Sequence, residues 1–432
     1  MGEEITTPEK KNWARPFFII WTGQALSLVG SQLVQFALVW WLTQTTGSAT
    51  VLATASLVAL IPQVVLGPFI GTLIDRWNRR LTLIIADSIS ALALVVMTYL
   101  FWSNQIEIWQ VFIIVFVRSL ANGFHWPAMQ ASVTLMVPKH FLTRLQGFNQ
   151  TMMGLLLILG APAGALLLSV LPMYGILAID IFTAIIAVIT LLFINIPQPV
   201  REATTDITLA RPSVWDDFRE GLRYVFSWSG LVMLLLISAL INLLLSPASS
   251  LLPIMVTKVF GGQALQLAWM QSAFGIGTIA GGILLGVWGG FRRRIVTSLV
   301  GLIVMGASMV LMGVAPGGMF FVAVAVVFIL GFTSPLINGP LVAVMQGTVD
   351  PAMQGRVFTL TQSFAGAMAP IGLLIAGPVA DIFGVRAWYI VGGVCTVILG
   401  MVSFGIPSIM HIEEGRHARL PEKDETALPN GG

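Results

Sequence analysis

Two long apolar runs of the chain are separated by one short charged segment, GTLIDRWNRR at Gly71–Arg80. The flanking runs, at about 50–74 and 81–102, are each long enough to cross a bilayer, which takes about 20 predominantly apolar residues. So short a connection predicts an antiparallel pair of membrane helices. Its three arginines predict that the connection faces the cytoplasm, where the basic residues of membrane proteins collect.

The rest of the chain has the same membrane character. Of its 432 residues, 56% are apolar and 9% are charged, whereas a soluble domain has about 25% charged residues. So few charges cannot cover the wetted surface of a soluble globule. The composition therefore excludes a soluble enzyme, a disordered protein and a nucleic-acid binder, and it makes the lipid bilayer an expected partner.

Apolar runs of membrane-spanning length recur along the chain and predict twelve helices. Their approximate limits are 17–42, 50–74, 81–102, 108–136, 142–170, 174–195, 229–257, 265–289, 295–314, 318–345, 354–380 and 386–408. The first run lacks the short apolar core and cleavage site of a signal peptide, so it is expected to remain as an anchor.

The basic residues predict the orientation of these helices. An even number of spans places both termini on one side. Of the 22 lysines and arginines, only Lys258 and Arg386 fall on the other side, and Arg118 lies inside a span. Both termini are therefore predicted to be cytoplasmic, in a multi-pass protein of the cell (inner) membrane that we expect to be a monomer.

The spans are predicted to form two halves around a linker. The predicted units are an N-terminal six-helix half (1–196), a cytoplasmic linker (197–228), a C-terminal six-helix half (229–410) and a loose cytoplasmic tail (411–432). In the linker, Ser213 and Asp216 form a capping-box-like start, and apolar residues from Trp215 to Val225 share one face. This pattern predicts a short amphipathic helix on the membrane surface, with a partner-binding helix as the alternative.

The two predicted halves resemble each other in sequence. The segment Arg144–Gly154 matches Arg356–Gly366 at its arginine, glutamine and final glycine, and Pro127 and Pro138 match Pro340 and Pro351. Parallel repeats of this kind are one architecture of secondary transporters. A receptor or a membrane-anchored enzyme needs no such symmetry, so the repeat favours transport by alternating access.

The segment Gly71–Arg80, with Leu83, resembles the loop signature of the major facilitator superfamily, Gly-x-Leu-Ala-Asp-Arg-x-Gly-Arg-Lys-x-x-Leu. The resemblance implies an all-α membrane protein with twelve transmembrane helices in two six-helix halves. It also implies a gating loop whose residues here are Gly71, Leu73, Asp75, Arg76, Arg79 and Arg80. Asn78 replaces a glycine, and it is expected to keep the turn because asparagine tolerates left-handed backbone angles.

Other stretches are similar to the macrolide-efflux-type drug exporters of that superfamily. They are Gly23–Gln24, Gly30–Gln32, Phe36–Ala37, Thr46–Ala49, Arg118–Phe124, Trp126–Ala128 and Gly377–Asp381 with Gly384. The resemblance covers nearly the whole chain and implies efflux of lipophilic drugs or macrolide-like compounds by proton antiport. Related sequences export siderophores, so an exporter of an endogenous metabolite or siderophore is the alternative.

Arg118 lies about ten residues inside the span at 108–136, near the middle of the membrane. A charge there costs about 2.5–3.5 kcal/mol on insertion scales and indicates a functional site by default. Asn122 and His125 follow on the same helical face. Two interpretations stay open: the face binds substrate and couples transport to protons, or Arg118 is paired to hold the bundle together and His125 only packs.

Neutral polar residues mark other spans. They are Gln24, Ser31 and Gln35 in the first span, Asn242 in the seventh and Asn338 in the tenth. In the superfamily fold, spans one, four, seven and ten line the central cavity, so these residues and the Arg118 face are expected to form one ring. An apolar lining is expected from Trp126, Met129, Trp269, Met270 and Phe274. Hydrogen bonds between helices are the alternative role of the polar set.

Asp87 and Asp180 are the two carboxylates expected to be buried, on spans that the resemblance places away from the cavity. Asp87 is expected to pair with the arginines of Gly71–Arg80, and Asp180 to make a similar structural ion pair. Because the cavity-lining spans one, seven and ten carry no acid, His125 is expected to be neutral at pH 7 and to act as a proton acceptor.

Nothing in the sequence predicts a cofactor or a metal site. The single cysteine, Cys395, is expected to be a small buried thiol, and the four histidines show no metal-ligand spacing. A Gly-x-x-x-x-Gly-Lys-Ser/Thr phosphate loop is absent, so ATP hydrolysis within the chain is excluded. An ion gradient is the expected energy source, with protons and a small lipophilic substrate as partners.

Overall fold

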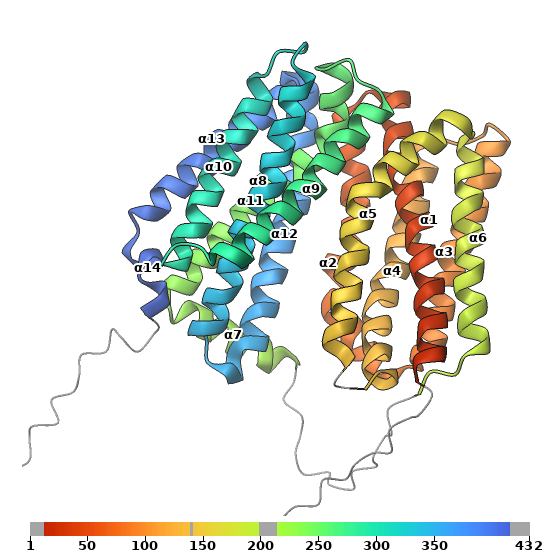
Figure 1. Cartoon of the computed structure of the whole chain (residues 1–432), viewed down its shortest axis with the longest axis horizontal. Coiled ribbons are helices and arrows are strands. Elements are labelled where there is room, and N and C mark those ends of the chain that lie inside the picture. The colour runs from red at the N-terminus through yellow and green to blue at the C-terminus, as the bar shows by residue number, and fades with distance from the viewer. Residues whose placement is uncertain (1–12, 139–140, 198–213, 415–432) are drawn as a thin grey trace, which may run out of the picture.

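The computed structural model describes residues 13–138, 141–197 and 214–414, and every regular element in these ranges is a helix (Figure 1). The long helices are α1 (Ala14–Thr46), α2 (Ala49–Arg76), α3 (Arg79–Trp102), α4 (Ile108–Met136), α5 (Leu142–Val170), α6 (Met173–Phe193), α8 (Ser229–Lys258), α9 (Ala264–Trp288), α10 (Arg294–Val314), α11 (Phe320–Thr348), α12 (Pro351–Phe383) and α13 (Val385–Phe404). All twelve are long and apolar enough to cross a membrane, which confirms the predicted number of spans.

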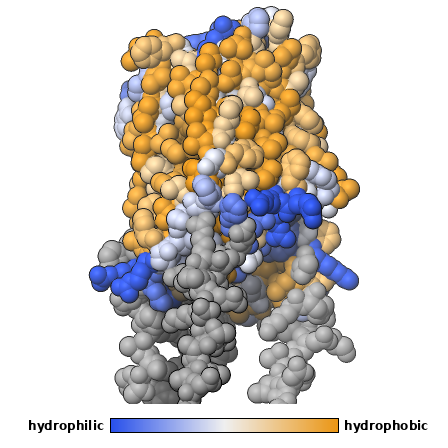
Figure 2. All heavy atoms as spheres, turned by 90° about the vertical axis from the view of Figure 1, so that its left-hand side faces the viewer, coloured by the Kyte–Doolittle hydropathy of each residue, from blue (hydrophilic) through white to orange (hydrophobic). Residues whose placement is uncertain are grey.

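The outer surface of the helices is apolar, as a lipid-facing surface must be. Phe193, Val287 and Phe321 are 86%, 85% and 76% exposed. Figure 2 shows hydrophobic residues over most of one flank, with the hydrophilic residues gathered mainly towards its lower end. Exposed apolar surface on this scale would be anomalous in a soluble protein and is explained by contact with lipid.

The first six long helices pack mainly on one another, and so do the last six. The most extensive contacts of the first group are those of α1 with α6 and of α3 with α4, and the most extensive of the second are those of α10 with α13 and of α9 with α11. The two groups meet through contacts of α2 with α12 and of α5 with α9. In Figure 1 the groups approach each other at the upper end and diverge towards the lower end, where α1 begins. The limits predicted for the halves, linker and tail stay predictions.

The connection between α2 and α3 shows how the charged segment is built. Asn78 is the N-cap of α3, and its side-chain oxygen accepts a hydrogen bond from Leu81 N at 3.1 Å. Its φ of −69° is not left-handed, so the expected backbone role of Asn78 is wrong. Asparagine fits here because it is a strong N-cap residue.

Helix α7 (Val214–Phe226) is present where the linker was predicted to hold an amphipathic helix. It packs against α12 and α8, with Val225 buried and Glu220 2.9 Å from Arg356. Ser213, which with Asp216 forms the predicted start signal, lies outside the described residues. The helix is therefore fixed to the last six spans by its contacts with α12.

Two further predictions, for Cys395 and for the tail from residue 411, concern the C-terminal part of the chain. Cys395 is exposed on α13, so the expected buried thiol is wrong: an apolar neighbourhood in a membrane protein also means the lipid face. The chain from Pro407 forms α14 (Pro407–Met410) and a 3-10 turn, η2 (Ile412–Glu414). Ile412 is 1% exposed and Glu413 accepts a hydrogen bond from Ile295 N, so the first residues of the predicted loose tail are packed.

Candidate functional site

A neutral cavity of about 710 Å³ lies between the two groups of helices. Its polar lining consists of Gln32, Gln35, Ser56, Asn242, Ser246, Ser249, Ser250, Gln271, Ser334, Asn338 and Tyr389. Among the described residues that line it, none is Asp, Glu, Lys, Arg or His. Apolar side chains such as Phe36, Phe274 and Met309 complete the wall. A mostly apolar cavity with a few hydrogen-bonding groups is typical of small-molecule sites.

The amides of Asn242 and Asn338 each donate one hydrogen bond, of 3.0 Å, to the carbonyl four residues earlier in their own helix. These bonds lie within α8 and α11 and do not join helices, unlike the alternative role considered for the polar set. A primary amide has two donors and an oxygen acceptor. Each amide therefore keeps capacity for a hydrogen bond with a ligand.

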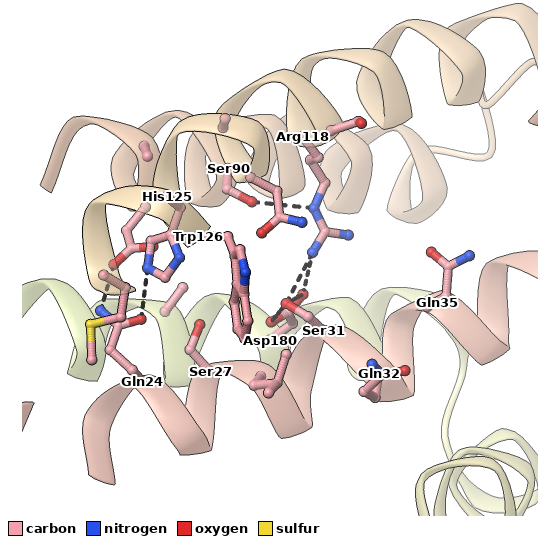
Figure 3. Close-up of a pocket in the computed structure, with 18 of the residues that line it drawn as sticks. Gln24, Ser27, Ser31, Gln32, Gln35, Ser90, Arg118, His125, Trp126 and Asp180 are labelled. Atoms are coloured by element: carbon pink, nitrogen blue, oxygen red, sulfur yellow. Dashed lines mark hydrogen bonds and ion pairs between the residues drawn. The ribbon is translucent and has the colours of Figure 1, made fainter. Parts of the chain in front are cut away.

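A second, charged pocket of about 420 Å³ lies within α1–α6 (Figure 3). Its lining includes four ionisable side chains, Asp87, Arg118, His125 and Asp180. Gln32 and Gln35 on α1 line both the charged pocket and the neutral cavity. The two spaces therefore share a wall but differ in charge.

The first pair in the charged pocket is Arg118 and Asp180. Arg118 Nη2 lies 2.8 Å from Asp180 Oδ2, and Ser31 Oγ donates to Asp180 Oδ1 at 3.2 Å. Ser90 Oγ accepts from Arg118 Nε at 3.3 Å. Asp180 is 1% exposed and Arg118 is 16% exposed. A carboxylate this buried depends on its partner, because an unpaired charge in such a place is strongly destabilising.

Gly30 explains how α6 comes close enough to α1 for this pair to form. A Cβ atom at Gly30 would lie 2.8 Å from Asp180 Oδ1 and closer still to the hydroxyl of Thr183. Any other residue would push α6 away from α1. The glycine therefore permits the contact between Ser31 and Asp180.

The second pair is Asp87 and His125, joined through Gln24. His125 Nε2 lies 3.3 Å from Asp87 Oδ1 and 3.0 Å from Gln24 Oε1. Gln24 Nε2 donates to Asp87 Oδ2 at 2.9 Å. Both neighbours of His125 Nε2 are acceptors, which assigns the hydrogen to Nε2 in the neutral ring. Asp87 is 12% and His125 18% exposed, so this pair is more accessible than Asp180.

The structure divides the single ring that the sequence predicted. Gln24, Ser31, Arg118, Asn122 and His125 line the charged pocket, whereas Asn242 and Asn338 line the neutral cavity and Gln35 lines both. Of the expected apolar lining, Trp126 and Met129 are in the charged pocket and Phe274 in the neutral cavity. Trp269 contacts Phe320, and Met270 is fully buried in the core, so neither residue lines the charged pocket or the neutral cavity.

The partner expected for Asp87 is wrong, whereas the burial and the ion pair expected for Asp180 are confirmed by its contact with Arg118. Asp87 pairs with His125 and not with the arginines near Arg80, and both Asp87 and Asp180 line the charged pocket. His125 and Arg118 consequently each have an acidic neighbour. A signal was available: Asp87 and Ser90 stand three residues apart on one helical face, matching the polar face of the next span.

The predicted gating segment is described in part. Gly71, Asp75 and Arg76 lie in the last turns of α2, and their side chains fall outside the described residues. Arg79 donates to Ala131 O at the end of α4, and Arg80 donates to Leu191 O at the end of α6, each at 2.7 Å. Cations suit the carbonyl ends of helices. These two arginines therefore tie the start of α3 to α4 and α6.

Comparisons with known proteins bear on the fold and the family. Residues 20–373 match the model of the Major Facilitator Superfamily. Macrolide efflux protein A of Streptococcus pyogenes is 34% identical over 391 residues, which covers 90% of this chain and 96% of the relative. Multidrug efflux pump Tap of Mycobacterium tuberculosis is 27% identical over 413 residues, which covers 92% of this chain and 95% of the relative.

Solved structures support the same architecture. The nucleoside transporter NupG superposes with a TM-score of 0.67 at 16% identity and covers 90% of this chain and 98% of that one. A bacterial homolog of the human lysosomal transporter Spinster gives a TM-score of 0.68 at 13% identity, with coverages of 94% and 98%. At these identities the likeness shows the fold alone.

Twelve helices that can cross a membrane, together with the family match and the efflux relative, identify a multi-pass membrane transporter and not an enzyme. The match over most of the chain and the 34% identical relative then place it: the chain belongs to the Major Facilitator Superfamily.

Proposed function

We propose that this chain exports bulky lipophilic compounds, such as macrolide-like drugs, in exchange for protons by alternating access. The observation that carries the proposal is the division into two adjoining spaces of opposite character. The neutral cavity of about 710 Å³ has the size and lining of a site for a bulky, uncharged, amphipathic solute. The efflux relatives are macrolide and multidrug exporters by name, which supports the same substrate class.

The charged pocket supplies the groups for proton coupling. Asp87 and His125 can take up a proton within hydrogen-bond distance of each other, and Gln24 orients both. The other charged groups of the pocket, Arg118 and Asp180, neutralise each other at 2.8 Å. We therefore assign proton binding to Asp87 and His125, and a structural role to Arg118 and Asp180.

The orientation follows from the basic residues. With both termini in the cytoplasm of a cell-membrane protein, the end of the molecule where α1 begins faces inward and the end where α2 begins faces outward. The helix groups meet at the outward end in Figure 1. We propose that the structure is the state open to the cytoplasm, in a protein that acts as a monomer.

Transport itself tests this function in two experiments. A pump-deficient bacterial host that expresses the chain should tolerate higher concentrations of macrolides and other lipophilic antibiotics than the same host with an empty vector. An unchanged tolerance across the panel, with the protein present in the membrane, would favour the alternative of a metabolite or siderophore exporter.

Energised vesicles test the driving ion. An uncoupler should stop efflux while ATP remains, since 100 mV corresponds to about 2.3 kcal/mol per charge. Efflux that persists with the uncoupler and follows an imposed sodium gradient would refute proton antiport.

A further inference from the structure

A carboxylate near the end of α12 binds the beginning of α2, across the boundary between the two groups of helices. Asp381 Oδ1 accepts a hydrogen bond from Ala49 N at 2.7 Å, and Oδ2 accepts from Ser48 Oγ at 2.8 Å and from Thr50 N at 3.0 Å. Asp381 and Ser48 are 333 residues apart in sequence. This carboxylate thus joins the two groups directly at their outward end.

The three bonds complete the cap of α2. The first N–H groups of a helix have no partner within it, and a negative charge at that end is favourable. Ser48 is the N-cap, and its hydroxyl accepts from Val51 N at 3.3 Å. Asp381 accepts hydrogen bonds from the two N–H groups that precede Val51 N in α2, those of Ala49 and Thr50. The cap of α2 is therefore shared between the two groups of helices.

The backbones of α2 and α12 touch at the same place. Gly377 lies one turn before Asp381, and a Cβ atom there would be 2.8 Å from Thr50 Cα. The glycine lets α12 approach α2 closely enough for the carboxylate to reach the helix start. Packing and hydrogen bonding therefore both close the outward end at one contact.

Exposure separates this carboxylate from the buried acid of the charged pocket. Asp180 is 1% exposed and depends on Arg118, whereas Asp381 is exposed. An exposed carboxylate and the N–H groups that it leaves can both be hydrated, so their separation costs far less than breaking a buried pair. Opening this contact therefore leaves no buried charge without a partner.

We propose that Asp381 is a positioning residue of the transport cycle, which holds the outward end closed by capping α2 and must leave α2 for that end to open. The proposal rests on alternating access and on the orientation proposed above. It is independent of which solute is carried and of which residues bind protons.

Labelling of a cysteine in the neutral cavity tests the proposal without any substrate. The parent carries Cys395→Ser, so that Ser249→Cys introduces a single thiol on the cavity wall. A membrane-impermeant maleimide is added outside right-side-out vesicles, and the labelling rate reports how often the outward end opens. Asp381→Asn should raise this rate about threefold, because it removes the charge that caps the helix.

Three companion variants make the result specific. Asp381→Glu should stay near the parent rate, since it keeps the charge, and Ser48→Ala should change it less than Asp381→Asn, since both backbone donors remain. Ala49→Pro removes a donor from the α2 side. Proline is accepted at the first helical position, and Ser48 already has the extended backbone (φ −98°, ψ 126°) that must precede it.

The expected pattern is faster labelling in both Asp381→Asn and Ala49→Pro, with equal labelling of all variants after denaturation. Parent-like rates in these two variants, in folded protein, would overturn the proposal. A rate in Asp381→Asn no higher than that in Ser48→Ala would also overturn it. A failure of drug export alone would leave the labelling result unaffected and would count against the proposed substrate only.

Discussion

The charged pocket and the neutral cavity share Gln32 and Gln35, but they differ in the charge of their other lining residues. The pocket within α1–α6 holds two carboxylates, a guanidinium and an imidazole, whereas none of the described lining residues of the cavity is Asp, Glu, Lys, Arg or His. Charges inside a membrane are costly and persist only in pairs or in wet cavities. The comparison teaches that a transporter can keep its ionisable groups apart from the surface that receives a lipophilic solute.

The largest expected effect comes from breaking the buried ion pair. Arg118→Ala should abolish stable expression, because it leaves the Asp180 carboxylate uncompensated, at a cost of about 3–5 kcal/mol. Membrane yield and thermal stability in detergent measure it. The 2.8 Å contact with Asp180 favours the interpretation in which Arg118 holds the helix bundle together.

The double variant Arg118→Gln with Asp180→Asn is the matched control. It removes both charges and should recover much of the yield that Arg118→Ala loses. A parent-like yield of the single variant would show that the pair does not hold α4 to α6.

Neutralising the second acid should leave the fold intact and uncouple transport. Asp87→Asn keeps the size of the side chain and a hydrogen bond with Gln24, but it removes the carboxylate beside His125. Gradient-driven efflux should fall at least about tenfold, which corresponds to about 1.4 kcal/mol, while substrate exchange without a gradient persists. Equal loss of both activities would place Asp87 in substrate handling.

The partner of Asp87 should set the pH dependence. His125→Gln keeps a hydrogen-bonding side chain that carries no titratable group, so the efflux rate should change less with pH between pH 5 and 8 than it does in the parent. Transport rates in vesicles over that range measure it, with Asn122→Ala as a control on the same helix face. A profile identical to that of the parent would remove His125 from coupling.

A substitution in the gating segment should reduce transport without changing either the charged pocket or the neutral cavity. Asp75→Asn should cut efflux severely at normal expression, as the family resemblance implies for this loop. Substrate affinity and the pH profile of the residual activity should stay as in the parent. Unchanged efflux would contradict the gating role.

The smallest effect is expected in the neutral cavity. Asn242→Ala removes one hydrogen-bonding group and should change the export of individual compounds by about twofold to tenfold, corresponding to about 0.5–1.5 kcal/mol. Compounds without hydrogen-bonding groups should be unaffected, and the proton dependence should stay the same. Drug tolerance across a panel, compared with Asn338→Ala, measures the selectivity.

The sequence predicted the helices well because membrane thickness fixes their length and lipid fixes their composition. It also singled out Arg118, His125 and Gln24, which line the charged pocket, since polar residues in apolar runs stand out. It gave Asp87 the wrong partner, because the apolar residues around a polar face of α3 do not show which neighbouring helix that face meets. The prediction for Cys395 failed because an apolar run does not show whether a face meets lipid or a neighbouring helix. The contact of Asp381 with α2 joins positions 332 residues apart, which no local pattern reveals.

The wall shared by the two spaces has a thermodynamic consequence. Gln32 and Gln35 line both spaces, so they are the lining residues through which solute binding in one can be coupled to proton binding in the other. Linkage between two binding equilibria is reciprocal: if an added proton weakens solute binding by some factor, solute binding weakens proton binding by that same factor. Adding solute to purified protein in weak buffer must then release protons into solution. The size of that release would give the number of protons linked to solute binding at the pH of the experiment, without any membrane or gradient.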